Sequence, residues 1–380
     1  MKKILALILS AAMLLSVMAG CQKEEAPAQP ETPPAAEEAA PEAAEKEPAA
    51  EETEKETGSD LDARKAELTE MLMEKANEVV VNENDVTFVD DSGREALTIA
   101  KNPKNVAVLY GSHACLWVEA GGTVSIGIGG KSASALYKEQ IGRDIMEDEG
   151  TIMVSDSSSG KNWDVETILA EQPDLIICST AMSGYETISA PAEAANIPVI
   201  ALTYSGIGDY LRWFKVFSNL NGTPEKWDEV AQGVLDQVVD ILAKVPAENN
   251  PTVLSLFPNS KGLSVNTSAS DTGAMLAQMN AVNVGDPENN ASAPRIEMSI
   301  EEIFEANPDY ILIQCSGPQE EAEEKLNGFI QDSPVWASLD AVKEGRVHYL
   351  PKELFHYRPN HLYGESYKML AELIYPDIEF

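Results

Sequence analysis

The apolar positions of this chain gather in short runs that alternate with stretches long enough to form a helix. Such runs are typical of buried parallel strands joined by helical crossovers. The pattern therefore predicts an α/β fold built on doubly wound parallel sheets. The predicted strands lie at residues 106–110, 123–128, 175–178 and 198–204, and in a second set at 252–257, 310–314 and 347–350.

Two different patterns precede these runs. Residues 62–80 are charged and rich in helix-forming residues, which predicts a leading helix. The segment VTFVDDSGREALTI, residues 86–99, alternates apolar and polar positions around Asp91, Ser92 and Gly93. Period-two alternation about such a cluster predicts a β-hairpin.

The two sets of strands share a repeated segment. WDVETILAEQPDLIICS, residues 163–179, aligns with MSIEEIFEANPDYILIQCS, residues 298–316. Each copy contains a short cap, a glutamate, an apolar helix face, Pro-Asp and a buried strand. The proline ends each helix because it lacks a backbone N–H and disfavours helix in the residue before it. The repeat predicts two related α/β lobes.

A helix is predicted between the lobes, in the segment TPEKWDEVAQGVLDQVVDILAKVP. Thr223 is the expected N-cap, Pro224 the first helical residue and Pro246 the stop. Apolar residues recur every three or four positions, so one stripe packs against both lobes. A single helix of about six turns would make a stiff connection that limits domain closure.

The N-terminus is typical of an export signal. A basic start precedes an apolar run from Ile4 to Leu15, and small residues stand directly before Cys21. This ending resembles the lipobox of bacterial lipoproteins, with Cys21 as the lipidated residue; the alternative is an ordinary secretory signal with an incidental cysteine. The following segment is rich in Glu, Ala and Pro and lacks aromatic residues, which predicts a disordered tether.

Charge and motif content exclude several functions. The formal net charge is −36, which argues against binding nucleic acid or a bare anionic membrane. The other three cysteines show no CxxC spacing and suit buried thiols, and the four histidines form no HExxH motif. No motif for nucleophilic or general acid–base catalysis is found. GIGGKSAS, residues 127–134, resembles a phosphate-binding loop, but Ser125 stands where that loop requires glycine.

Taken together, these features resemble the substrate-binding lipoproteins of ABC importers for iron-siderophores, haem and cobalamin. The resemblance covers roughly residues 85–380 and implies two Rossmann-like lobes joined by a single long α-helix, with a ligand cleft between them. The implied division is a signal peptide (1–20), a lipidated cysteine with an acidic tether (21–60), an N-terminal lobe (61–206), an interlobe helix region (207–246) and a C-terminal lobe (247–380).

Candidate ligand contacts lie in the loops that follow the strands, because ligands of open α/β sheets bind beyond the strands' carboxyl ends. Aromatic faces with a few basic groups suit a flat, partly anionic chelate or macrocycle. His113 and His356 or Tyr357 are candidate axial ligands of a haem iron, and the alternative is an ordinary polar role. Lys131, Lys161 and Arg358 are candidate carboxylate contacts or solvated charges. The predicted contacts are His113, Lys131, Ser132, Trp163, Tyr185, His356, Tyr357 and Arg358.

The resemblance also assigns one docking residue to each lobe. Glu166 and Glu301 match the family's surface glutamates that dock onto arginines of the permease. The alternative is that each merely stabilises its own helix N-terminus.

The function expected from the resemblance is non-catalytic capture, without a catalytic cofactor. A monomer anchored by lipid on the outer side of the cell membrane would bind an iron-siderophore, haem or corrinoid and deliver it to an ABC permease with its ATPase. The histidine content disfavours a second candidate, a binding protein for a bare transition metal. A surface enzyme or adhesin on the same scaffold is a further alternative, because a fold alone does not fix function.

Overall fold

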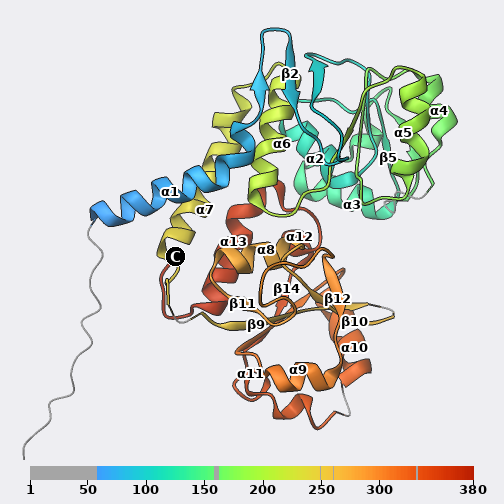
Figure 1. The fold of residues 1–380 in the computed structure, drawn as a ribbon. Coiled ribbons are helices and arrows are strands. Elements are labelled where there is room, and N and C mark those ends of the chain that lie inside the picture. The colour runs from blue at the N-terminus through green and yellow to red at the C-terminus, as the bar shows by residue number, and fades with distance from the viewer. Residues whose placement is uncertain (1–57, 158–161, 249, 260, 331–332) are drawn as a thin grey trace, which may run out of the picture. The chain divides into compact units, whose positions relative to one another are not determined.

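The computed structural model describes most of the chain after residue 57, and Figure 1 shows its fold. The predicted signal peptide, Cys21, the tether up to residue 57 and Lys161 lie outside the described residues. All the elements named below belong to one unit, Lys55–Phe380. The described residues are 58–157, 162–248, 250–259, 261–330 and 333–380.

The first lobe is built on a five-stranded, wholly parallel sheet in the order β6-β5-β4-β7-β8. All four strands predicted for this lobe are confirmed, and the half-buried edge strand β6 is an addition. The strands are β4 (Val106–Val108), β5 (Ile126–Ile128), β6 (Ile152–Ser155), β7 (Leu175–Cys178) and β8 (Val199–Ala201). The intervening helices are α2 (Gly111–Glu119), α3 (Lys131–Gln140), the 3-10 turn η1 (Ile145–Glu147), α4 (Val165–Ala170) and α5 (Gly184–Ala194).

The second lobe is built on a mixed sheet in the order β12-β10-β9-β13-β14, with β11 also paired to β9. Strands β9, β13 and β14 are parallel as expected, but β10 is antiparallel to both β9 and β12. The sheet of this lobe is therefore mixed, and its antiparallel strand β10 was not predicted from the sequence. The chain turns back directly after β9, where Gly262 pairs with Asn259. The strands are β9 (Thr252–Asn259), β10 (Gly262–Asn266), β11 (Val282–Asn283), β12 (Arg295–Glu297), β13 (Tyr310–Gln314) and β14 (Val347–Leu350).

Short helices complete the second lobe and cover its sheet. Near the end of the chain, η4 leads directly into the terminal helix α13. The helices and helical turns of the second lobe are α8 (Asp271–Gln278), α9 (Ile300–Ala306), α10 (Gln319–Ile330), η3 (Trp336–Ser338), α11 (Asp340–Lys343), α12 (Lys352–Phe355), η4 (Asn360–Leu362) and α13 (Tyr363–Ile374).

The predicted hairpin is confirmed and is fixed to the first lobe. Strands β2 (Asp85–Phe88) and β3 (Leu97–Ala100) are antiparallel, and the short β1 (Val80–Val81) pairs with β2. Beyond β2, the buried Asp90 carboxylate accepts a hydrogen bond from the backbone N–H of Ala201 in β8, at 2.9 Å, and is ion-paired with Arg94. This anchor ties the hairpin to an edge strand of the parallel sheet.

The connection between the sheets contains two helices, α6 (Ile207–Leu220) and α7 (Gln232–Lys244), and a π-helical turn, η2 (Trp227–Ala231), precedes α7. The predicted helix therefore begins later than expected, and Thr223 is not its N-cap. The Thr223 hydroxyl instead donates to the carbonyl of Ala120, at 2.8 Å. This bond ties the α6–η2 turn to the end of α2.

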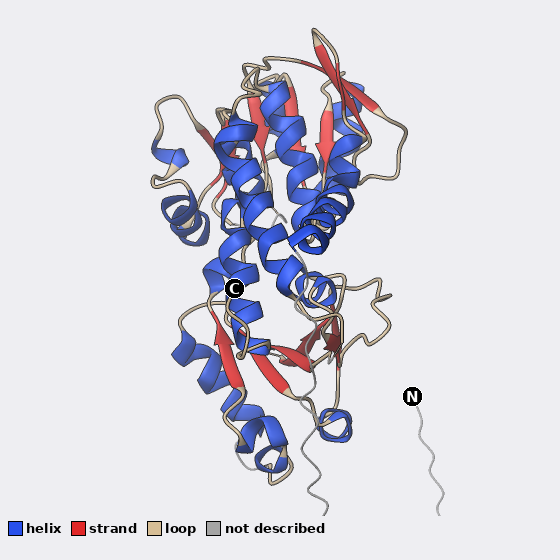
Figure 2. Cartoon of the chain, turned by 90° about the vertical axis from the view of Figure 1, so that its left-hand side faces the viewer, coloured by secondary structure: helices blue, strands red, loops and turns tan. Residues whose placement is uncertain are grey.

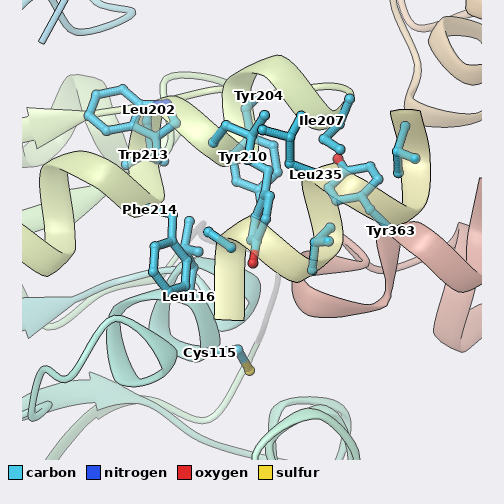
Figure 3. Packing of buried hydrophobic residues seen from close by; sticks show 14 of the residues in the cluster. Cys115, Leu116, Leu202, Tyr204, Ile207, Tyr210, Trp213, Phe214, Leu235 and Tyr363 are labelled. Atoms are coloured by element: carbon cyan, nitrogen blue, oxygen red, sulfur yellow. The ribbon is translucent and has the colours of Figure 1, made fainter. Parts of the chain in front are cut away.

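Four helices pack together beside the two sheets. Helix α1 (Gly58–Asn77) contacts α6 and α7, and α13 contacts α7 from the second lobe. Figure 2 shows helices running between an upper and a lower group of strands. Figure 3 shows the aromatic side chains at this junction, among them Tyr210 and Trp213 of α6 and Tyr363 of α13. Each buried aromatic side chain contributes about 2 kcal/mol of burial energy, so this shared core holds the two lobes together.

The repeated segment forms the same structure in both lobes. Gln172 lies two residues after α4 and Asn307 directly follows α9; both have positive φ, and Pro-Asp follows in each copy. Asp174 accepts hydrogen bonds from the backbone at residues 104 and 105, directly before β4, and Asp309 accepts from Thr252 at the start of β9. The aspartate of each Pro-Asp thus fixes the start of the neighbouring strand.

Within the described part of the chain, no helix combines the length and the apolar character that crossing a membrane would require.

Candidate functional site

A cavity of about 320 Å³ lies where loops of the two lobes meet. It sits beyond the carboxyl ends of the parallel strands, as expected for an open α/β sheet. The first lobe contributes Tyr110, Gly111, Ser112, Ser132, Ala133, Leu136 and Met182. The second contributes Ala269, Ser270, Asp271, Thr272, Pro294, Arg295, Gln314, Phe355, His356, Tyr357 and Arg358.

The N-termini of α2, α3 and α8 all lie at the cavity wall. The unpaired N–H groups of a helix N-terminus carry partial positive charge, which favours an anion nearby. At α3 the turn requires glycine, because Gly130 has φ +86° and a Cβ there would lie 1.9 Å from the carbonyl oxygen of Asp156. The GIGGKSAS segment is therefore the turn that delivers α3 to the cavity.

Arg358 and Asp271 form an ion pair in the wall. The Asp271 carboxylate is buried and also accepts hydrogen bonds from the Gly206 N–H at 2.8 Å and the Tyr363 hydroxyl at 2.9 Å. The guanidinium carbon of Arg358 lies 5.5 Å from the centre of the Tyr204 ring. The charge of Arg358 is thus already balanced within the protein.

His356 presents a neutral imidazole to the cavity. Its ring stacks on Phe257, with centroids 5.7 Å apart and planes 8° apart. Burial lowers the pKa of His356 to about 4, and the nearby cations Arg295 and Lys352 act in the same direction. Its buried Nδ1 has no hydrogen-bond partner among the described residues. An unprotonated imidazole nitrogen is the form that metals bind.

Tyr357 lies next to His356 in the same wall. Burial raises the pKa of the Tyr357 hydroxyl, although Lys352 opposes this shift. The Lys352 ammonium lies 5.6 Å from the centre of the Tyr357 ring, in cation–π geometry. Tyr357 therefore adds a second aromatic face next to His356.

His113 does not line the cavity. It is 1% exposed within α2, and its ring packs against Tyr110 and Tyr204 at 4.6 Å and 5.8 Å between centroids. Burial lowers its pKa well below the ordinary histidine value, with a further contribution from Arg358. His113 is therefore a neutral, aromatic-packed core residue, one layer behind the lining residue Tyr110.

The structure separates the predicted contacts into two groups. Ser132, His356, Tyr357 and Arg358 line the cavity together. The other four predicted contacts, His113, Lys131, Trp163 and Tyr185, do not line it. Lys131 is exposed at the first position of α3, Trp163 is buried in the apolar core of the first lobe, and Tyr185 lies in a separate depression beside Arg94.

Arg295 and Thr272 are among the polar residues of the cavity wall that sequence reasoning missed. Neither directly follows a predicted strand, so the rule that directed attention to strand ends passed over them. A weak signal was present for Arg295, because basic residues are scarce in so acidic a chain.

Glu166 and Glu301 occupy equivalent, exposed positions in α4 and α9. Asp164 and Ser299 cap the two helices through side-chain bonds to the backbone. No ion pair involves either glutamate among the described residues. In the same part of the chain, no three His, Cys, Asp or Glu side chains lie close enough together to hold a metal ion.

Two α/β lobes with a ligand-sized cavity between their loops define a solute-binding protein of the two-lobed class. The chain belongs to the periplasmic binding protein family, whose sequence model matches residues 106–354. No curated protein matches the sequence. The family consists of extracytoplasmic solute-binding proteins rather than enzymes.

Several solved structures share the fold. An ABC transporter substrate-binding protein from Listeria monocytogenes EGD-e is 18% identical with a TM-score of 0.57, covering 73% of this chain and 100% of that one. The periplasmic heme-binding protein RhuT from Roseiflexus sp. RS-1 is 18% identical with a TM-score of 0.53, covering 72% and 98%. The siderophore periplasmic binding protein from the fuscachelin gene cluster of Thermobifida fusca is 20% identical with a TM-score of 0.54, covering 73% and 98%.

Proposed function

We propose that this protein is the extracytoplasmic solute-binding component of an ABC importer. It captures an iron-siderophore, haem or corrinoid and delivers it to the membrane permease. The observation that carries this proposal is the cavity, where the aromatic rings of Tyr110, Tyr357 and His356 lie near two guanidinium groups and three helix N-termini. Flat rings bind the faces of a chelate or macrocycle, and the positive groups bind its oxyanions.

The names of two structural relatives match two of these ligand classes. One is described as a heme-binding protein and another as a siderophore-binding protein. Their low identity to this chain shows a shared fold, so the ligand class is inferred from the cavity's own side chains.

If the ligand is haem, the second lobe supplies the axial ligand. His356 and Tyr357 line the cavity, whereas His113 is enclosed by Tyr110 and Tyr204. A neutral imidazole with a low pKa is ready to bind iron without first losing a proton. Coordination from both lobes, which the sequence suggested, would require His113 to leave its core position.

The remaining parts of the proposal concern anchoring and delivery. Lipidation at Cys21 would hold the monomeric protein at the outer side of the cell membrane, and the acidic tether would span the distance to the folded lobes. Glu166 and Glu301 would dock onto arginines of the permease, one from each lobe.

A titration of the purified protein tests the function. Haemin, a ferric catecholate, a ferric hydroxamate and cobalamin are added in turn, with absorbance and thermal unfolding as readouts. We expect saturable binding of at least one and a rise in Tm by mass action. If haemin binds, His356→Ala removes the shift of its Soret band, while His113→Ala and His348→Ala retain it. Failure of all four compounds to bind would contradict the proposal.

A further inference from the structure

Arg295 differs from the other arginine of the cavity in having no carboxylate partner. Arg358 is paired with Asp271, but no ion pair to Arg295 occurs among the described residues. The formal net charge of the chain is −36, so carboxylates are abundant. An uncompensated guanidinium at a cavity wall is therefore available to bind an anion from outside the protein.

The position of Arg295 is set by the sheet. It is the first residue of the edge strand β12 and lies directly opposite Asn266 of β10 in the antiparallel register. Its Nε donates a hydrogen bond to Oδ1 of the buried Asn266, at 3.0 Å. The backbone pairing and this bond together fix the base of the guanidinium.

A buried network determines which atom Asn266 turns toward Arg295. The Phe355 carbonyl can only accept, so Gln314 donates to it through Nε2, at 2.7 Å. This leaves Oε1 of Gln314 to accept from Nδ2 of Asn266, at 2.8 Å, and Nδ2 also bonds to Ser255 Oγ. Because its Nδ2 is committed, Asn266 must present Oδ1 to Arg295. The network thus orients the Arg295 guanidinium, which can only donate hydrogen bonds, at the cavity.

The guanidinium is also supported by an aromatic ring. Its central carbon lies 4.0 Å from the centre of Phe257, and the same Phe257 ring stacks on His356. Cation–π contact with one face leaves the outer N–H groups of Arg295 free for hydrogen bonding. Phe257 thus supports both Arg295 and His356, and these two residues present a charged group and a flat ring to the cavity.

Thr272 adds a hydroxyl group to the same wall. It is 1% exposed, lies in the first turn of α8, and its Oγ1 has no hydrogen-bond partner among the described residues. A buried unpartnered hydroxyl costs free energy unless a bound group satisfies it. Thr272 and the α8 N-terminus thus offer donors to an acceptor in the cavity.

We propose that Arg295 is the residue that selects an anionic ligand, by a charge-assisted hydrogen bond to an oxyanion beside a ligand ring that lies against His356. This inference rests on the proposed function and narrows it. The shared chemistry is an anionic oxygen next to a flat ring, which is a propionate carboxylate beside the macrocycle in haem and a phenolate oxygen on its own aromatic ring in a ferric catecholate. Cobalamin carries neutral amides at the edge of its corrin ring, so it presents no oxyanion at the position that this contact requires.

The test compares anionic with neutral ligands and Arg295 with a matched arginine. The variants are Arg295→Gln, Arg295→Lys and the control Arg346→Gln. Arg346 also lies over an aromatic ring of the second lobe, Tyr310, at 5.5 Å, but it is paired with Glu344 and lies outside the cavity. The ligands are haemin, haemin dimethyl ester, an anionic ferric tris-catecholate, a neutral ferric trihydroxamate and cobalamin.

We expect the wild type to prefer haemin over its ester, or the catecholate over the trihydroxamate. Arg295→Gln should weaken binding of the preferred anionic ligand about 10- to 100-fold, the range for a charge-assisted hydrogen bond. Arg295→Lys should retain part of the affinity, because it keeps the charge but loses the planar fork. Arg346→Gln should bind like the wild type.

The outcomes separate this inference from the function on which it rests. If the wild type binds none of the five compounds, the proposed function fails and the inference fails with it. If the wild type binds one of them but Arg295→Gln binds it equally well, the function stands and the role of Arg295 is refuted. A wild-type preference for cobalamin or the neutral trihydroxamate would also refute anion selection. Comparing the binding of haemin with that of the ferric catecholate shows whether the oxyanion is a haem propionate or a catecholate oxygen.

Discussion

Arg358 is ion-paired with Asp271, the first residue of α8. The pair joins the segment before α13 to α8 across the cavity wall. Asp271 also holds Gly206 and Tyr363, which links the wall to α6 and α13. Arg358 therefore has a structural task in addition to any contact with ligand.

Replacing Arg358 should destabilise the protein. Arg358→Ala leaves the buried Asp271 carboxylate without its countercharge, and loss of one partner of a buried pair costs about 3 kcal/mol. Urea unfolding measures the loss. Arg358→Ala combined with Asp271→Asn should cost less than the sum of the two single changes. Additive effects would show that the pair contributes no coupling energy.

Gly130 should tolerate no side chain. Gly130→Ala forces a Cβ toward the Asp156 carbonyl at 1.9 Å and should cost more than about 3 kcal/mol, because the obstacle is backbone. Gly142 is the control: it also has positive φ, but a Cβ there would meet nothing within 4 Å, so Gly142→Ala should cost about 1 kcal/mol. Thermal or urea unfolding compares them. Equal losses would mean that φ alone, not the contact, requires glycine at residue 130.

The pair of His361 and Glu119 should make stability depend on pH. Nδ1 of His361 lies 2.7 Å from the Glu119 carboxylate, which raises the pKa of His361 against the effect of burial, with a smaller contribution from Glu365. A raised histidine pKa means that the stabilisation is complete below the unfolded value of about 6.5 and is lost as pH rises through the folded pKa.

Unfolding free energies between pH 6 and 8.5 test this prediction. The wild type should lose about 1 kcal/mol more than His361→Gln over this window. This loss in unfolding free energy is smaller than the usual contribution of a charge-assisted hydrogen bond, because the His361 side chain is 34% exposed and solvent screens the pair. Parallel pH profiles for the two proteins would contradict the assignment.

Asn360 connects the two lobes. Its buried side chain donates to the Ser112 carbonyl at 3.1 Å and to Gln140 at 2.9 Å, and it accepts from the Tyr204 hydroxyl. Asn360→Ala should cost about 3 kcal/mol, because it leaves buried polar groups unpaired. Asn360 has φ +55°, so Asn360→Gly should cost about 1 kcal/mol less than Asn360→Ala. Urea unfolding distinguishes the two, and a loss below 1 kcal/mol for either variant would refute the bridging role.

Docking through Glu166 and Glu301 is tested by charge reversal. Glu166→Arg and Glu301→Arg should each lower ligand-dependent stimulation of the permease ATPase about tenfold or more, because the change puts like charges in contact. Ligand affinity and Tm should stay unchanged, since both glutamates are exposed and lie outside the cavity. Glu305→Arg, on the same helix as Glu301, is the control. Unchanged stimulation in both test variants would refute docking.

Local patterns in the sequence predicted most of the fold. The runs at β4, β5, β7 and β13 are largely continuous apolar segments, because these strands are buried on both faces. Strand β12 was missed for the opposite reason, since its three residues are all exposed at a sheet edge. Thr223 was predicted to be an N-cap, but its hydroxyl donates to the carbonyl of Ala120 at the end of α2, which is distant in the sequence.

Residues of the candidate site were predicted from the sequence only when they lie shortly after a strand, because the end of the strand then fixes their place beside the cavity. His356 and Arg358 follow the last strand closely, so a strand-end rule found them. The same rule selected His113, whose burial depends on Tyr204 from another strand-end loop.

By itself, the sequence determined the two related lobes, their parallel strands and the repeat, because apolar periodicity and proline act over a few residues. Only the tertiary structure decided which side chains share the cavity. Arg295 reaches it through the register of β12 with β10, and Asn266 turns its carbonyl oxygen to Arg295 because Gln314 and Phe355 leave no other arrangement. These contacts join residues far apart in the chain, so their energies exist only once the sheet has formed.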